Sequence, residues 1–226
     1  MKPVLLLVHG WGFDAGFWTP LRAALEGYET VAWDLGFFGG AARPDLPAGR
    51  DVVAVGHSFG ALWLLHHRPV AWRALVAVNG FGCFTQREDF PQGNAARPLQ
   101  RMIAQFGAAP GAVVAAFRAR CGGVEAVPGS LDVTALAAGL QGLAQWDARP
   151  AVVDLALCGR ADPLVPEAMS AACFPADVTQ WHAGGICCRR RMRVGVPRSY
   201  GRFWSLWGER AQGADWAGVF SRGGAL

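Results

Sequence analysis

Short runs of apolar residues recur along the chain, and a glycine, aspartate or asparagine follows each of them within two residues. Runs without alternating polar residues are typical of parallel strands that are buried on both faces of a sheet. We therefore expect strands at 4–8, 31–33, 52–55, 74–78 and 152–157.

Helical patterns lie between the first of these runs, at 20–25 and at 59–67, and Pro69 stops the second. Alternating strands and helices imply right-handed crossovers and a doubly wound, mostly parallel sheet. In such α/β folds the functional groups gather at the carboxyl ends of the strands.

The alternation breaks between Cys83 and Asp147. Three amphipathic helices are expected there, at 97–106, 112–121 and 132–146. In the last of them, Leu136, Leu140 and Leu143 share one face at helical spacing. A helical insertion between two strands suggests a lid that covers substrate. The expected division is a core of 1–82 and 148–185, a lid of 83–147, and an atypical tail of 186–226.

Length and composition favour one packed domain, expected to be a monomer. The chain has 226 residues, of which 52% are hydrophobic and 17% charged, which argues against disorder. It has no run long enough to span a bilayer and no export-signal pattern, so a cytoplasmic protein is expected. The six cysteines fit neither a disulfide framework nor a zinc pattern. We expect four of them to be buried apolar residues: Cys83, Cys121, Cys158 and Cys173.

The net charge of +4 is unevenly distributed. Residues 186–226 carry eight arginines against Glu209 and Asp215, so this tail alone contributes +6. From the totals of 21 basic and 17 acidic residues, 13 and 15 remain for the rest of the chain. That mildly acidic body gives no basic surface for nucleic acid.

The segment Gly56-His57-Ser58-Phe59-Gly60 carries the strongest chemical signal. It follows an expected strand and opens an expected helix, which is the setting in which G-x-S-x-G marks a nucleophile elbow. The alternative is a glycine-rich turn that happens to contain a serine. We identify Ser58 as the nucleophile, at a helix N-terminus that favours developing negative charge.

The segment His9-Gly10-Trp11-Gly12 follows the first strand, where such enzymes place a second oxyanion donor. We assign the oxyanion hole to the backbone N–H groups of Trp11 and Phe59. His9 is more typical of a structural residue that hydrogen-bonds this loop than of a base. The other early histidines, His57, His66 and His67, are poorly placed to reach Ser58.

The acid of a serine triad should follow a late strand. Asp162 lies after the apolar run 152–157, in the chain order Ser, Asp, His of this type of enzyme. An ordinary Asp-Pro turn is the alternative explanation. Asp34, after the second strand, is a weaker choice and more typical of a loop cap.

With these motifs placed, the chain resembles the α/β-hydrolase superfamily, and within it the pimeloyl-[acyl-carrier protein] methyl ester carboxylesterases of biotin synthesis. The resemblance extends from Leu5 to about Gly185. It rests on the two motifs above, on Trp18, on Asp34-Leu35, and on the segments 78–85, 89–91 and 159–166. Gly36 departs from the family pattern, which commonly has a proline there.

The resemblance implies a carboxylesterase that acts on a pimeloyl methyl ester attached to acyl-carrier protein, without a metal or organic cofactor. It also implies substrate contacts at Trp11 and Phe84, and a basic lid face that meets the acidic carrier. The candidate carrier contacts are Arg97, Arg101, Arg118 and Arg120, although a solvated helix face explains surface arginines equally well. A generic small-ester esterase and a non-catalytic binding module are the competing functions.

The expected catalytic histidine is missing from its usual place. The family has it after a Gly-Gly-like turn, but here Gly184-Gly185 is followed by Ile186-Cys187-Cys188, and no histidine follows His182. In a neighbouring reading frame the next codons can spell His-Met-Leu-Pro-Pro-Pro-His. We therefore hypothesise that residues 186–226 are frame-shifted, with His182 acting as the base as the rival explanation.

Overall fold

The structure is a computed structural model, and it describes all residues except 1, 26, 122–126, 128–129 and 183–226. The backbone of His182 is described and its side chain is not. The arginine-rich tail and the proposed frame-shifted segment therefore lie outside the described residues.

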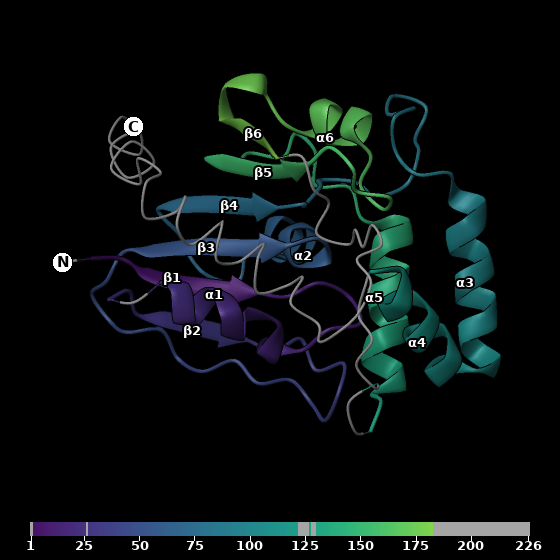
Figure 1. Ribbon diagram of the computed structural model, residues 1–226, viewed down its shortest axis with the longest axis horizontal. Helices are drawn as coiled ribbons and strands as arrows, with labels where there is room; N and C mark the ends of the chain where they lie inside the picture. Colours follow the sequence, from purple (N-terminus) through teal and green to yellow (C-terminus); the bar gives the residue numbers. More distant parts are fainter. Residues whose placement is uncertain (1, 26, 122–126, 128–129, 183–226) are drawn as a thin grey trace, which may run out of the picture.

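A parallel six-stranded sheet forms the centre of the described chain (Figure 1). The strands are β1 (Val4–Val8), β2 (Thr30–Trp33), β3 (Val52–His57), β4 (Ala74–Val78), β5 (Leu155–Gly159) and β6 (Thr179–His182). Their order is β2-β1-β3-β4-β5-β6, and every pair in it is parallel. The order reverses direction beside β1 and β3, the position where ligands bind in open α/β sheets.

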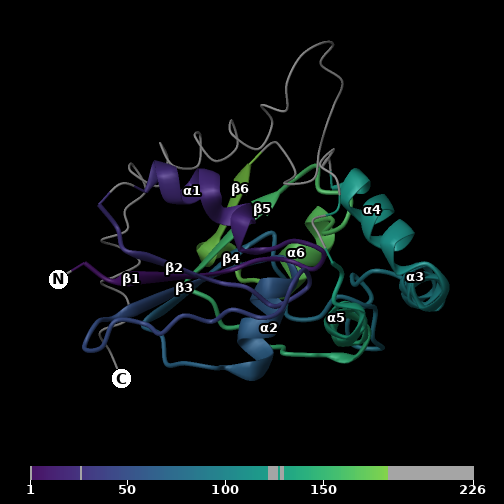
Figure 2. The ribbon, with the colours of Figure 1, turned by 90° about the horizontal axis from the view of Figure 1, so that it is seen from below.

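Helices cover both faces of this sheet (Figure 2). Helix α1 (Thr19–Ala24), preceded by the 3-10 turn η1 (Ala15–Trp18), packs on the face that contains Leu5 and Leu7. Helix α2 (Phe59–His67) packs on the opposite face, with Val4, Leu6 and Val8, and α6 (Glu167–Cys173) contributes to the same core. A further 3-10 turn, η2 (Ala176–Val178), leads into β6.

The described residues of the insertion between β4 and β5 form three helices: α3 (Ala96–Ala108), α4 (Pro110–Arg120) and α5 (Val133–Gln145). Figure 1 shows them beside the carboxyl ends of the central strands. The shared apolar face expected on the last helix is confirmed, because Leu136, Leu140 and Leu143 are all buried. We refer to residues 83–147 as the helical insertion.

Two parts of the late sheet differ from expectation. The strand expected at 152–157 begins only at Leu155, since Val152 is 70% exposed and Asp154 instead accepts a hydrogen bond from the Leu75 N–H, at 2.8 Å. Helix α6 and strand β6 were not expected. The four residues of β6 mix polar and aromatic side chains, a weak pattern that is typical of an edge strand.

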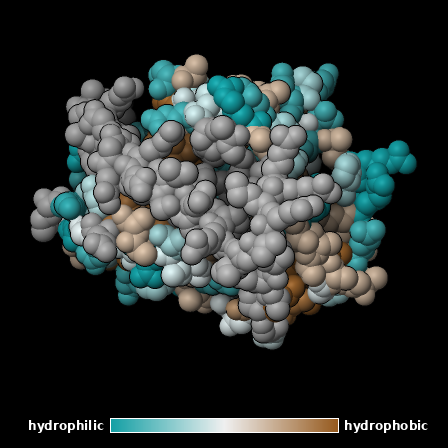
Figure 3. All heavy atoms as spheres, viewed as in Figure 1, coloured by the Kyte–Doolittle hydropathy of each residue, from teal (hydrophilic) through white to brown (hydrophobic). Residues whose placement is uncertain are grey.

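The expected burial of the cysteines is confirmed, because Cys83, Cys121, Cys158 and Cys173 are all buried free thiols. Among the described residues, no helix has the length and apolar character needed to cross a membrane. Figure 3 shows hydrophilic and hydrophobic residues interspersed on the visible face, with apolar side chains gathered over the helical insertion.

Candidate active site

Ser58 occupies the sharp turn between β3 and α2. Its backbone has φ 50° and ψ −119°, a conformation that side-chain-bearing residues rarely adopt. Its N–H donates to the carbonyl oxygen of Val78 on the neighbouring strand, at 3.0 Å, and its side chain is half-buried. The turn therefore presents the serine at the carboxyl edge of the sheet instead of burying it in the strand.

The two flanking glycines allow this turn to close. A Cβ atom at Gly56 would lie 2.5 Å from the Cα of Ala61, and one at Gly60 would collide with the carbonyl oxygen of Val8. Both contacts are with backbone, which cannot rotate away. The turn requires glycine at both positions, because the neighbouring backbone segments lie too close to leave room for a side chain.

The turn after β1 faces Ser58. A Cβ atom at Gly10 would lie only 3.3 Å from the Cβ of Ser58, so the two turns are in contact. Among the described residues, neither the N–H of Trp11 nor that of Phe59 donates to an intramolecular acceptor. Within the described part of the chain, these two N–H groups are thus unpaired beside Ser58, as the donors of an oxyanion hole would have to be.

His9 is a structural residue of this turn, as its sequence position suggests. Its Nδ1 lies 2.9 Å from the carbonyl oxygen of Gly10, and its Nε2 accepts the N–H of Leu35 at 2.9 Å. Asp34 caps the adjacent loop by accepting the N–H groups of Ala15 and Gly36. Burial opposes ionisation of Asp34, but the adjacent imidazole of His9 and the hydrogen bonds from these amides hold its pKa below the usual value.

Asp162 lies in the turn after β5, and 6% of it is exposed. Its Oδ1 accepts two backbone N–H groups, from Leu164 at 2.8 Å and from Val165 at 3.0 Å. Its Oδ2 accepts the side-chain amide of Asn79, at the end of β4. These three donors hold the carboxylate at the carboxyl edge of the sheet, as an orienting acid requires.

Asn79 is a partner of Asp162 that the sequence pattern does not identify. It is buried with φ 43°, and its Oδ1 accepts the N–H of Gly159 at 3.1 Å while its amide donates to Asp162. A signal was present, because an asparagine directly after an apolar strand suits a left-handed backbone. Nothing in the sequence shows that its partner lies 83 residues later.

The remaining early histidines do not meet Ser58 as bases. His57 points into the core, where its ring stacks on Phe17 with the centroids 4.3 Å apart, and among the described residues its Nδ1 has no hydrogen-bond partner. Burial, with a smaller effect from His9, lowers the pKa of His57 to about 3. His66 and His67 are exposed at the far end of α2, where the ring of His66 stacks on Trp146.

His182 ends strand β6 and pairs in register with Gly159 of β5. The turn that carries Asp162 begins directly after Gly159. The backbones of Asp162 and His182 therefore lie at the same edge of the sheet, after two neighbouring strands. The alternative base, a histidine from a restored reading frame after residue 185, falls outside the described residues.

The arginines of the helical insertion do not form one exposed face. Arg97, Arg101 and Arg120 are exposed, but Arg118 is only 6% exposed, and its Nη1 donates to the carbonyl oxygen of Gly12 at 3.0 Å. The expectation that Arg118 contacts a carrier protein from the surface is therefore wrong. Its guanidinium is directed into the molecule, towards the turn that follows β1.

The two expected aromatic substrate contacts also differ in exposure. The indole of Trp11 is 1% exposed and its Nε1 donates to the carbonyl oxygen of Leu136, at 2.8 Å. Phe84 is half-buried and packs against Phe81, with ring centroids 5.0 Å apart. Of these two, only Phe84 has a partly exposed ring in this conformation.

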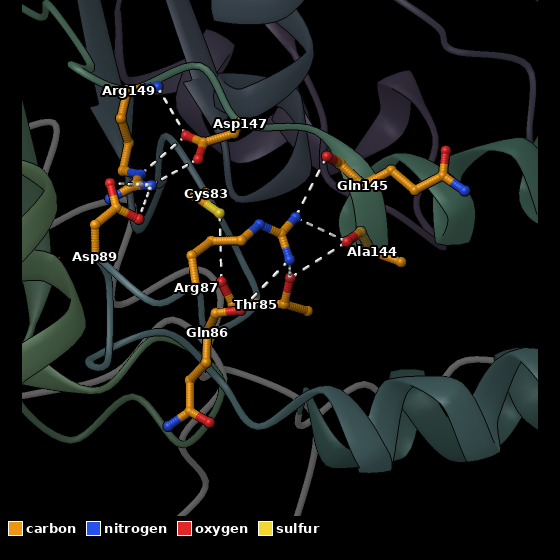
Figure 4. A network of polar contacts seen from close by, with 9 residues as sticks. All are labelled: Cys83, Thr85, Gln86, Arg87, Asp89, Ala144, Gln145, Asp147 and Arg149. Carbon is orange, nitrogen blue, oxygen red and sulfur yellow. Dashed lines mark hydrogen bonds and ion pairs between the residues drawn. The ribbon is translucent and has the colours of Figure 1, made fainter.

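A polar network ties the two ends of the helical insertion together (Figure 4). Arg87 donates to the carbonyl oxygens of Ala144 and Gln145, at the carboxyl end of α5. Arg149 pairs with both Asp89 and Asp147, and its hydrogen bonds lower the pKa of Asp147. The first and last segments of the insertion are thus held to each other, close to the points where the chain leaves and rejoins the sheet.

The fold defines the class: this is an α/β-hydrolase fold with a helical insertion. Among solved structures, an esterase from Exiguobacterium antarcticum matches with a TM-score of 0.63 and 17% identity, covering 80% of this chain and 82% of that one. The BioG protein of Haemophilus influenzae matches with a TM-score of 0.53 and 16% identity, covering 81% and 88%.

Sequence comparison is more specific but covers less of the chain. A pimeloyl-[acyl-carrier protein] methyl ester esterase from Neisseria meningitidis serogroup C is 34% identical over an alignment of 116 residues, and the match covers 44% of this chain and 45% of the relative. The chain therefore matches less than half the length of that curated relative. No family model matches the chain.

Proposed function

We propose that this chain is a serine carboxylesterase of the α/β-hydrolase class. The observation that carries the proposal is the backbone of Ser58, held at φ 50° between strand and helix, beside two N–H groups that have no acceptor among the described residues. A strained turn of this kind persists only where the surrounding structure enforces it, and such turns cluster at active sites.

In the proposed mechanism, Ser58 attacks the ester carbonyl and the N–H groups of Trp11 and Phe59 stabilise the resulting oxyanion. Loss of one such donor typically slows turnover by about 10²–10³-fold. A histidine, oriented by Asp162, accepts the serine proton and returns it to the leaving alcohol. We propose His182 as the histidine of this chain, because its backbone lies on the strand next to Asp162.

We further propose a pimeloyl methyl ester on acyl-carrier protein as the substrate, which would place the enzyme in biotin synthesis. The named function of the Neisseria meningitidis relative supports this, as do the exposed Arg97, Arg101 and Arg120 on the helical insertion. An acidic carrier would be attracted to such a surface. The helical insertion would cover the acyl chain, with Phe84 as one contact.

The first test is hydrolysis of a short-chain p-nitrophenyl ester by the chain as written, with Ser58→Ala as the blank. Turnover that requires Ser58 supports the esterase and a working base, and His182→Ala should then abolish it. A folded chain without turnover would contradict His182 as base. Recovery after restoring the neighbouring frame beyond residue 185 would then assign the base to the restored segment.

Substrate preference separates the competing functions. A pimeloyl-carrier esterase should hydrolyse the carrier-bound methyl ester faster than the free ester, and Arg97→Glu should reduce that preference. Equal rates on the two substrates would instead indicate a generic small-ester esterase. A non-catalytic binding module would leave Ser58 unreactive towards an organophosphonate.

A further inference from the structure

The turn that carries Trp11 is held at two points by the helical insertion. From α5, the carbonyl oxygen of Leu136 accepts the indole N–H of Trp11 at 2.8 Å. From α4, the guanidinium of Arg118 donates to the carbonyl oxygen of Gly12 at 3.0 Å. Two different helices therefore fix successive residues of one turn.

The packing around these bonds leaves little freedom. A Cβ atom at Gly139 of α5 would lie 2.6 Å from the Cδ1 of Trp11, so the indole occupies the space that glycine leaves on that helix. Phe117 of α4 meets the same indole edge-on, with ring centroids 4.9 Å apart. Moving either helix would move the indole, and the backbone of the turn with it.

Arg118 is suited to hold backbone and poorly suited to bind a partner at the surface. Its charged group is buried and lies over the rings of Phe13 and Phe38, at 5.2 Å and 5.8 Å from their centroids. A buried guanidinium is stable only where acceptors satisfy it, so those acceptors determine its position.

We propose that helices α4 and α5 position the N–H of Trp11 as an oxyanion donor, and that Arg118 and Gly139 are positioning residues for hydrolysis. The inference rests on the proposed esterase function and deepens it. It makes the helical insertion part of the catalytic machinery as well as a cover for substrate. A catalytic group displaced by about 1 Å can cost on the order of 100-fold in rate.

Two variants test this positioning, each with a matched control. Gly139→Ala pushes the indole away, and Gly107→Ala is its control, because a methyl group there on α3 meets nothing within 4 Å. Arg118→Met removes the bond to Gly12, and its control is Arg68→Met, which changes an exposed arginine at the far end of α2. Each test variant should lower kcat for a p-nitrophenyl ester by roughly 10–100-fold, with KM nearly unchanged.

Both controls should stay within about twofold of the original chain, since neither touches the turn. A different pattern would refute the positioning role: an increase in KM for a carrier-bound ester alone, with unchanged hydrolysis of the small ester. That result would make Arg118 a docking residue.

Amide hydrogen exchange gives a readout that does not need turnover. The N–H of Phe13 closes the same turn by donating to the carbonyl oxygen of Gly10, at 3.3 Å. Its exchange should be at least several-fold faster in Gly139→Ala and Arg118→Met than in the controls, while amides of β3 stay protected. Equal exchange at Phe13 in all four variants would overturn the proposal.

The two readouts separate this inference from the proposed function. A chain without Ser58-dependent turnover, but with faster exchange at Phe13 in the two test variants, would refute the esterase activity and leave the link between insertion and turn supported. Normal turnover, with neither kcat nor exchange changed in the test variants, would refute the link alone.

Discussion

The contact between Asn79 and Asp162 can be tested by turning the amide into a second carboxyl group. In Asn79→Asp the introduced group should keep the bond from Gly159 but face Asp162 with a like charge. Two carboxylates in hydrogen-bond contact repel by about 5 kcal/mol at an effective dielectric constant near 20. The folded variant should therefore retain one proton between them through neutral pH.

The sign of the effect follows from proton linkage. The pKa of the introduced carboxyl is raised by folding, so the variant is least perturbed in acid and loses stability as the pH rises. The free energy of unfolding should fall by about 1.4 kcal/mol per pH unit, or about 3 kcal/mol between pH 5 and pH 7. For a chain of this size, that corresponds to roughly 6–12 °C in the unfolding midpoint.

The assay is thermal unfolding of Asn79→Asp, Asn79→Ala and the original chain at pH 5 and pH 7. The alanine variant loses the hydrogen bond without gaining a charge, so its loss of stability relative to the original chain should be the same at both pH values. If the aspartate variant shows an equal deficit at pH 5 and pH 7, its carboxyl group does not face Asp162 and our account of the acid's environment is wrong.

Three further results are expected. Gly60→Ala should lower the free energy of unfolding by about 2 kcal/mol or more, because its methyl group would collide with the backbone. A thermal unfolding midpoint equal to that of Gly107→Ala would contradict this. His57 has a folded pKa of about 3 because it is buried, so the protein should lose stability as the pH falls below 6.5. His57→Phe should remove about 2 kcal/mol of this loss of stability at pH 5, which urea unfolding at pH 7 and pH 5 can measure. If the pH dependence of the variant equals that of the original chain, this account of His57 is wrong. Arg87→Met should lower the free energy of unfolding by about 1 kcal/mol, because the carbonyl groups of Ala144 and Gln145 lose their hydrogen bonds. Thermal unfolding should show a smaller loss of stability for Arg97→Met, which changes an exposed side chain.

The parts of the fold that could be predicted are those in which local pattern and burial agree. Strands 4–8 and 74–78 are uninterrupted apolar runs and are buried throughout, so the pattern alone located them. Strand β6 has no uninterrupted apolar run that would locate it, and among the described strands it pairs with β5 alone. Pairing with a neighbour stabilises this strand, and no pattern within four residues encodes that pairing.

The same division applies to the site. The elbow is a local structure, since Gly56 and Gly60 lie within two residues of the serine they flank, and a five-residue motif specifies it. The environment of Asp162 depends on Asn79, and the turn at Trp11 depends on helices more than 100 residues away. Arg118 shows the consequence, because a basic residue on an amphipathic helix is normally exposed and only the fold reveals that its charge is buried.

The magnitude of turnover can separate the two explanations for the base. An α/β-hydrolase site that keeps its oxyanion donors but lacks the triad base retains about 10³–10⁴-fold acceleration over water and loses on the order of a million-fold against the complete triad. A chain that uses His182 should therefore act within a few orders of magnitude of its frame-restored counterpart. A chain without a base should fall to nearly the level of Ser58→Ala, because an unactivated serine adds little to the oxyanion hole. The gap between these outcomes is far larger than any effect of the positioning residues, so the base can be assigned before the contributions of Asn79, Arg118 and Gly139 are measured.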